Sequence, residues 1–166
     1  MGYIYGLDPG AASGALAWID HEGRAIGIDY AAGQDESLPA RLAEHFKSAD
    51  LLVVERILAY AGGRTPPQDL IDLAYSSAIA IGVAGAMGIP VIHVQTSVWK
   101  KALGVTKDKN TSIAKACLLF GERQYLASKS KNKKGLVVAD HNHAEALLLA
   151  YYGYMTGRKT NYELAG

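Results

Sequence analysis

Three short segments near the N-terminus alternate apolar residues with small or polar ones, which is the pattern of half-buried β-strands. They cover residues 2–8, 14–20 and 24–30. The sequences DPG-AAS and HEG join them. Because such residues form tight turns, we predict an antiparallel three-stranded meander.

Two later apolar runs predict further strands. Residues 51–54 are wholly apolar and end in two valines, which is typical of a strand that is buried on both faces. Residues 90–94 form the second run. Both follow helical patterns, so we expect them to extend the sheet as parallel strands.

Helical spacing of apolar residues recurs in the remaining segments. We predict helices at residues 37–47, 68–87, 96–104, 108–121 and 142–152. Ser37, Thr96 and Asp108 occupy positions where helix-capping side chains are expected. Residues 57–67 are rich in glycine and proline and residues 128–135 read SKSKNKKG, so both are expected to be loops.

The order of these elements predicts one α/β domain, residues 1–166, with a mixed five-stranded sheet flanked by helices. A chain of 166 residues, 49% of them hydrophobic and 20% charged, is large enough to bury a core. The longest apolar run, residues 78–92, contains glycine and proline and is shorter than the roughly 20 residues of a membrane span. With no secretory signal and a single cysteine, Cys117, we expect a cytoplasmic protein without membrane contact.

The net charge of +1 conceals a strong segregation of charge. Residues 100–134 carry +8, whereas residues 1–99 carry −6 and residues 135–166 carry −1. A basic block of this kind neutralises nucleic-acid phosphates and releases their counterions. On charge alone, a solvated lysine-rich surface explains the block equally well.

Aromatic and basic residues meet in the predicted helix at residues 96–104. Trp99 precedes Lys100 and Lys101, and we interpret it as a packing anchor for this helix rather than as a base-stacking platform. Farther along the chain, three lysines surround a predicted helix N-terminus, which itself favours phosphate. They are Lys107, Lys109 and Lys115.

Two acidic residues stand at the ends of predicted strands. Asp8 ends the first strand and Glu55 follows the apolar run at residues 51–54. If the two strands are parallel neighbours, both carboxylates lie at one rim of the sheet, where ligands bind in α/β folds. The alternatives are that Asp8 only begins a turn and that Glu55 is an exposed strand end paired with Arg56.

Glu145 is the third acid of interest because it lies in an apolar helical segment, HAEALLLAYY, with no lysine or arginine within four residues. Burying an unpaired carboxylate is costly, so another group must stabilise it, and a metal ion would do so. His141 precedes it by one helical turn, with Asp140 and Asn142 beside it. The alternative is a helix cap followed by a solvent-facing glutamate.

Acids from three segments suit a hard divalent cation such as Mg²⁺, which takes oxygen ligands and prepares water as a nucleophile. Four motifs, in chain order, resemble those of the RuvC-like Holliday junction resolvases, especially the short phage-type members. They are GLDPGAASGALA, LLVVERI, IHVQTSVWKKALGVTKDK and DHNHAEALLLAYYG, spanning roughly residues 3–153.

The resemblance implies an RNase H-like fold and a homodimer that cuts four-way DNA junctions with Mg²⁺, for which Mn²⁺ can substitute. It implies that Asp8, Glu55 and Glu145 bind the metal and that Lys109, with Lys101 and Lys107, contacts the DNA backbone. We extend the DNA-binding set to Lys100 and Lys115.

One position departs from the family pattern. Members of the family place an acid or a histidine three residues before the last acid, where this chain has Asn142. His141 or Asp140 could supply that ligand, and His141 could also help to move a proton. The catalytic set expected from the sequence is therefore Asp8, Glu55, His141 and Glu145.

Two other functions fit parts of the sequence. Asp8 followed by small residues also resembles the phosphate loop of actin-type and sugar-kinase phosphotransferases, but those enzymes close two such domains around ATP, and 166 residues supply only one. A junction-binding module without catalysis would use the basic block alone.

Overall fold

The computed structural model describes residues 2–10, 13–31, 35–57, 67–121, 127–131 and 137–164. Seven strands are present among these residues: β1 (Tyr3–Asp8), β2 (Ala15–Ile19), β3 (Ala25–Tyr30), β4 (Ala49–Glu55), β5 (Val91–Val94), β6 (Ala127–Lys131) and β7 (Val137–Ala139). The helices are α1 (Leu38–His45), the short 3₁₀ helix η1 (Phe46–Ser48), α2 (Pro67–Ala86), α3 (Thr96–Leu103), α4 (Lys109–Phe120) and α5 (His141–Leu164).

The main sheet has five strands in the order β3-β2-β1-β4-β5. The pairs β3–β2 and β2–β1 are antiparallel, whereas β1–β4 and β4–β5 are parallel. The predicted meander and the two predicted parallel strands are therefore confirmed.

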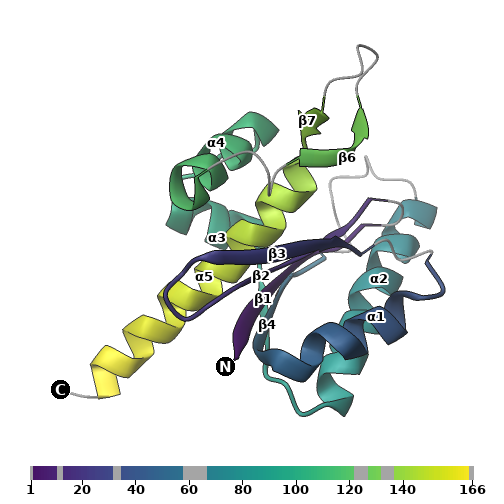
Figure 1. The fold of residues 1–166 in the computed structure, drawn as a ribbon, viewed down its shortest axis with the longest axis horizontal. Helices are drawn as coiled ribbons and strands as arrows, with labels where there is room; N and C mark the ends of the chain where they lie inside the picture. Colours follow the sequence, from purple (N-terminus) through teal and green to yellow (C-terminus); the bar gives the residue numbers. More distant parts are fainter. Residues whose placement is uncertain are drawn as a thin grey trace.

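Helices cover both faces of this sheet (Figure 1). The long helix α5 crosses one face diagonally with α3 and α4 beside it, and α1 and α2 lie on the opposite face. The strands divide their apolar side chains between the two layers: Ile4 packs on the α5 side, and Tyr5 and Leu7 pack on the other side.

Gly6 of β1 permits the close approach of α5 to the sheet. A Cβ atom at this position would overlap the backbone of α5 at the carbonyl oxygen of Ala146 and the amide nitrogen of Ala150. Glycine is the residue that allows such backbone contact. Because Gly6 precedes Asp8 by two residues, this contact places the turn of α5 that carries Glu145 against the end of β1.

Two of the three predicted helix caps are wrong. Helix α3 begins at Thr96 itself with Gln95 before it. Ser37 stands before α1 but makes no side-chain capping bond, and its hydroxyl donates to Asp35. The third, Asp108, caps α4 by accepting a hydrogen bond from the Asn110 amide.

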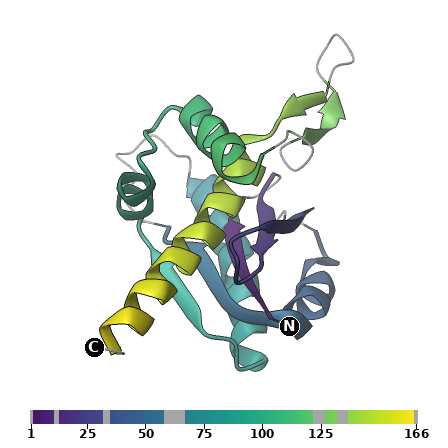
Figure 2. The same ribbon diagram turned by 60° about the vertical axis from the view of Figure 1, so that its left-hand side comes forward.

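The C-terminal half contains more regular structure than expected. The predicted basic loop at 128–135 is wrong for its first four residues, which belong to β6 and pair antiparallel with β7. This hairpin projects beyond the N-terminal end of α5 (Figure 2). Backbone hydrogen bonds to a partner strand form regardless of side-chain charge, so a lysine-rich segment can still enter a ladder. Helix α5 also continues to Leu164, twelve residues past the predicted end.

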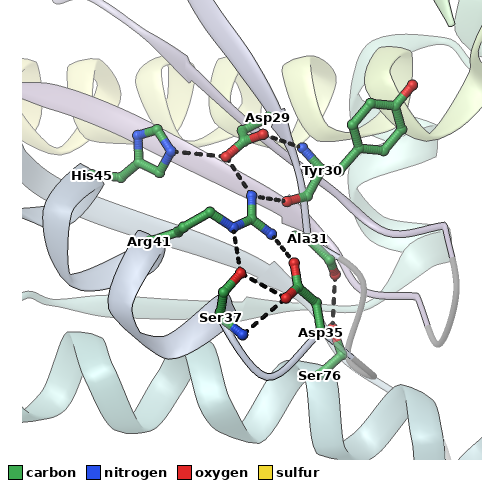
Figure 3. Close-up of polar contacts among 8 residues, drawn as sticks. All are labelled: Asp29, Tyr30, Ala31, Asp35, Ser37, Arg41, His45 and Ser76. Carbon is green, nitrogen blue, oxygen red and sulfur yellow. Dashed lines mark hydrogen bonds and ion pairs between the residues drawn. The ribbon is translucent and has the colours of Figure 1, made fainter. Parts of the chain in front are cut away.

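A polar network ties the edge strand β3 and the chain that follows it to the helices behind (Figure 3). The guanidinium of Arg41 in α1 contacts Asp29 at 2.6 Å and Asp35 at 2.7 Å, and it donates to the Tyr30 carbonyl. Ser76 of α2 donates to the carbonyl of Ala31. These bonds fix the end of the sheet that carries Asp8.

Helix α2 is unusually apolar for a helix with this much exposed surface. Over the 19 residues Gln68–Ala86 its mean hydropathy is 1.3. By length and composition alone, this helix could cross a membrane. Only 22% of that stretch is buried. Ile71 and Tyr75 are each about 60% exposed. A single helix of this kind is weak evidence for a membrane span, so it does not overturn the expectation that the chain makes no membrane contact.

The predicted loop at 57–67 falls mostly at 58–66, and the second half of the predicted basic loop is residues 132–135. Both stretches lie outside the described residues.

Candidate active site

Asp8 and Glu55 end two adjacent parallel strands. Leu7 of β1 is in register with Val54 of β4, so the two acids follow at the same rim of the sheet, as predicted. Burial raises the pKa of Asp8 well above its ordinary value, and the negative charges of Glu145 and Glu55 raise it further. Asp8 is therefore close enough to Glu145 and to Glu55 to be affected by the charge of each.

A cavity of about 530 Å³ opens beside Asp8. Glu145 and His141 of α5 line it together with Lys100, Lys107 and Lys109. The predicted common face of His141 and Glu145 is thus confirmed, because both side chains reach the same cavity. Asp69 from the first turn of α2 also lines it, and no motif or spacing in the sequence singles this acid out.

Glu145 has a cationic partner that its own helix does not supply. Its Oε1 accepts hydrogen bonds from Lys100 Nζ at 2.7 Å and from the Ser112 hydroxyl at 2.8 Å. The side chains of Lys100 and Glu145 are only 13% and 11% exposed. The prediction that another group must stabilise this carboxylate is therefore confirmed, and in this structure α3 and α4, distant in sequence, bring a lysine and a serine to it. It is also not a solvent-facing glutamate.

Glu55 is oriented by two residues of α3. Thr96 Oγ1 donates to its Oε1 at 2.6 Å and the indole Nε1 of Trp99 donates to its Oε2 at 2.9 Å. Trp99 is fully buried, so the packing-anchor interpretation is confirmed. Glu55 is held by α3 and not by its neighbour Arg56.

The start of α5 holds the residues considered for the fourth metal ligand. Asp140 Oδ1 accepts the Asn142 amide at 2.9 Å, which is a helix-capping bond. The side-chain amide of Asn142 donates to the carbonyl of Ser13. His141 Nε2 lies 2.9 Å from Lys109 Nζ. Burial lowers the pKa of His141, and the positive charge of Lys109 lowers it further.

The predicted DNA-binding lysines divide into two groups. Lys100, Lys107 and Lys109 line the acidic cavity, and Lys101 joins Lys100 and Lys107 around a neighbouring cavity of about 470 Å³. Lys115 is half-buried on α4 and lines neither cavity.

The oxygen donors around the first cavity fit a hard divalent cation. Asp8 and Glu145 face one space, and the acids around Asp8 raise its pKa, which shows that negative charge gathers there. As they stand, no three acidic, histidine or cysteine side chains in the part of the chain that the structure describes close around a single point. The Glu55 carboxylate is bound by Thr96 and Trp99 of α3, and the His141 imidazole is in contact with Lys109.

Comparison with solved structures finds the same arrangement of elements in T. thermophilus RuvC in complex with a Holliday junction substrate. The TM-score is 0.70 at 16% sequence identity, over 95% of this chain and 96% of that chain. A second Thermus thermophilus RuvC structure gives 0.68 at 16% identity over the same shares. The yeast mitochondrial Holliday junction resolvase Ydc2 gives 0.58 at 12% identity, over 99% of this chain and 85% of that chain.

No protein-family profile and no curated protein sequence matches the chain. Identities this low establish the fold alone. The chain therefore has the fold of RuvC, which is the RNase H-like fold that its four motifs predicted.

Proposed function

We propose that this protein is a structure-selective DNA endonuclease that resolves four-way DNA junctions by divalent-metal-assisted hydrolysis. The observation that carries the proposal is the convergence of Asp8 and Glu145, from opposite ends of the chain, in one cavity whose wall also bears lysines. Metal-assisted hydrolysis of a phosphodiester uses acids to hold the metal and cations to bind the phosphates. A structural neighbour that is bound to a Holliday junction substrate supports this choice of DNA.

Each residue has a distinct task in this proposal. Asp8, Glu55 and Glu145 would hold Mg²⁺, or Mn²⁺ in its place. When bound, the metal supplies an activated water and neutralises charge on the phosphate. Thr96 and Trp99 keep the Glu55 carboxylate in one orientation. Lys107 and Lys109 bind the DNA backbone and align it over the acids. Lys101 and Lys115 extend this surface.

His141 is our choice for the residue that completes the metal-binding set. It faces the cavity with Glu145, whereas Asp140 uses one carboxylate oxygen to cap α5. An imidazole must be neutral to bind a metal, and the lowered pKa of His141 favours the neutral form near pH 7. His141→Ala should therefore remove more activity than Asp140→Ala, and Mn²⁺ should support cutting better than Mg²⁺. The reverse order of the two defects would assign the position to Asp140.

The deciding experiment measures cleavage of a four-way junction with Mg²⁺ or Mn²⁺, beside ATP turnover by the same preparation. We expect metal-dependent cutting and no ATP turnover. Asp8→Asn should abolish cutting while leaving junction binding nearly intact, because it changes a metal ligand and not the lysine surface. Cutting by Asp8→Asn near the wild-type rate would refute the assignment of Asp8 to the metal site. ATP turnover would favour the phosphotransferase function, and binding without any cutting would favour the binding module.

The exposed face of α2 supports a homodimer. Residues 71, 75, 78, 82 and 85 are all exposed and repeat at spacings of four and three, which is the spacing of helices that pack along a shared seam. A Cβ atom added at Gly82 or Gly85 would meet nothing within 4 Å, so a second helix can come close there. A second copy of the chain would cover this apolar face and place two active sites in one particle. The two strands to be cut in a four-way junction require two such sites.

Sedimentation velocity tests this dimer. The wild-type protein should sediment as a dimer and Tyr75→Glu as a monomer, because the substitution puts a charge in the apolar seam. Leu118→Glu is the matched control: Leu118 is 78% exposed on α4, so that variant should remain dimeric. A monomeric wild-type protein that binds lipid vesicles would instead make α2 a membrane-contacting helix. The cytoplasmic setting expected from the sequence stays a prediction.

A further inference from the structure

Lys100 forms an ion pair that is unusual in its burial. Its Nζ atom lies 2.7 Å from Glu145 Oε1, and both side chains are close to nine-tenths buried. The two residues are 45 positions apart, on α3 and α5. Exposed ion pairs are often incidental, but a buried one is costly to break, because the remaining charge is left without compensation.

The charges around this pair are mainly negative. Asp8 is acted on by the charges of Glu145, Glu55 and Asp140, which all favour its protonated form, and Lys100 is the cation that opposes them. Lys109 is engaged with His141. The ammonium of Lys100 therefore compensates the acids from inside the site.

The position of Lys100 also allows its ammonium to leave. The side chain borders both the acidic cavity and the neighbouring cavity of about 470 Å³ formed with Lys101 and Lys107. Ser112 would still donate to Glu145 Oε1 after such a movement. The Glu145 carboxylate would then keep its hydrogen bond from Ser112, and its negative charge would be free to bind a metal ion.

We propose that Lys100 is an internal counter-cation of the acidic site: it neutralises Glu145 when no metal is bound and competes with the metal for that carboxylate. This role deepens the proposed function, since it rests on metal binding by Asp8 and Glu145. It has two consequences. The fold is kept intact without metal, and metal binds more weakly than the acids alone would bind it.

Mn²⁺ titration of metal-free protein by calorimetry, without DNA, tests the proposal. Lys100→Met keeps most of the side-chain length and removes the charge, so Mn²⁺ should bind about tenfold more tightly or better. Lys47→Met is the control, because Lys47 is highly exposed and pairs with Glu44 outside the acidic site. Its Mn²⁺ affinity should stay within about twofold of wild type.

Thermal unfolding gives a second readout. Without metal, Lys100→Met should unfold at a lower temperature than wild type, and saturating Mn²⁺ should raise its Tm by more than it raises that of wild type. Lys100→Gln covers the case in which Lys100→Met fails to fold, because the amide keeps a donor toward Glu145 while removing the charge. It should show the same tightening of Mn²⁺ binding.

The outcomes separate this inference from the nuclease proposal. Unchanged or weaker Mn²⁺ binding in the folded neutral variants would overturn the counter-cation role even if the wild-type protein cuts junctions. Tighter Mn²⁺ binding in those variants, together with a wild-type protein that cuts no junction, would support the role of Lys100 and refute the nuclease.

Discussion

The indole nitrogen of Trp99 donates a 2.9 Å hydrogen bond to Glu55 Oε2, so one buried side chain both anchors α3 in the core and orients an acid at the end of β4. Thr96, one turn earlier in the same helix, holds the other carboxylate oxygen. The packing of α3 in the core therefore sets the orientation of the Glu55 carboxylate.

Trp99→Phe should therefore reduce junction cleavage about 10- to 100-fold, which is the usual cost of removing a bond that orients a metal-binding carboxylate. The phenyl ring keeps most of the packing, so the fold should survive. Single-turnover cleavage at saturating metal measures the effect, with the Tm recorded on the same protein. Trp18→Phe is the matched control, since Trp18 stacks on Tyr5 away from the acids, and its cleavage rate should not change. Wild-type cutting by Trp99→Phe would show that Glu55 needs no such support.

Neutralising Lys107 and Lys109 together should weaken junction binding and reduce the log-log dependence of affinity on salt by about two, because roughly one counterion is released per phosphate contact. Both lysines are exposed at the cavity wall. Fluorescence anisotropy at several salt concentrations gives the slope. Lys47→Ala, on a distant exposed lysine, should leave the slope unchanged. An unchanged slope in the double variant would mean that these lysines are solvated surface residues that do not contact DNA phosphates.

Gly6→Ala should destabilise the protein by about 1–3 kcal/mol or more, because the added methyl group meets the backbone of α5, which cannot rotate away. In a domain of this size each kcal/mol lowers the Tm by about 2–4 °C. Junction cleavage should fall as well, since α5 carries Glu145. The comparison is Gly157→Ala in the same helix, where nothing lies within 4 Å of the new Cβ and stability should be equal or higher. Equal stability of both variants would mean that α5 shifts freely on the sheet.

Arg41→Met should lower stability near pH 7 by about 1 kcal/mol, the usual scale for a partly exposed ion pair. Burial by itself raises the pKa of Asp29, but hydrogen bonds from His45 and from the Tyr30 amide, together with Arg41, lower it below its ordinary value. A carboxylate with a lowered folded-state pKa stabilises the fold above the unfolded pKa of about 3.9 and loses this contribution as the pH falls through the folded value.

The stability difference between Arg41→Met and wild type should accordingly shrink in acid. Urea unfolding at steps from about pH 7 down to about pH 3 measures it. Lys47→Met removes a cation from a highly exposed pair with Glu44 and should show little difference at any pH. A difference for Arg41→Met that is the same at both ends of the range would assign its effect to lost packing and not to charge.

The pattern of apolar residues was enough to predict the strands of the sheet and to single out acids at the strand ends. Alternation in β1 to β3 and the unbroken apolar run of β4 follow directly from which face of each strand is buried, so the meander and a buried parallel strand could be predicted. That β4 pairs with β1 is known only from the structure. Asp8 and Glu55 could be placed at one rim only on the condition that their strands are parallel neighbours, and the pairing of β1 with β4 meets this condition. Asp108 could be predicted as a cap because its bond is local.

The tertiary structure decided which side chains meet across long separations. Nothing near Glu145 in the sequence indicates that Lys100 and Ser112 reach it, and nothing near Glu55 indicates Thr96 and Trp99. These contacts depend on how closely α3, α4 and α5 pack, and that packing depends on shape complementarity, such as the contact at Gly6, which leaves no periodic trace in the sequence. Thr96, predicted as a cap, lies inside α3 because the helix begins one residue earlier than predicted, and its hydroxyl donates to Glu55.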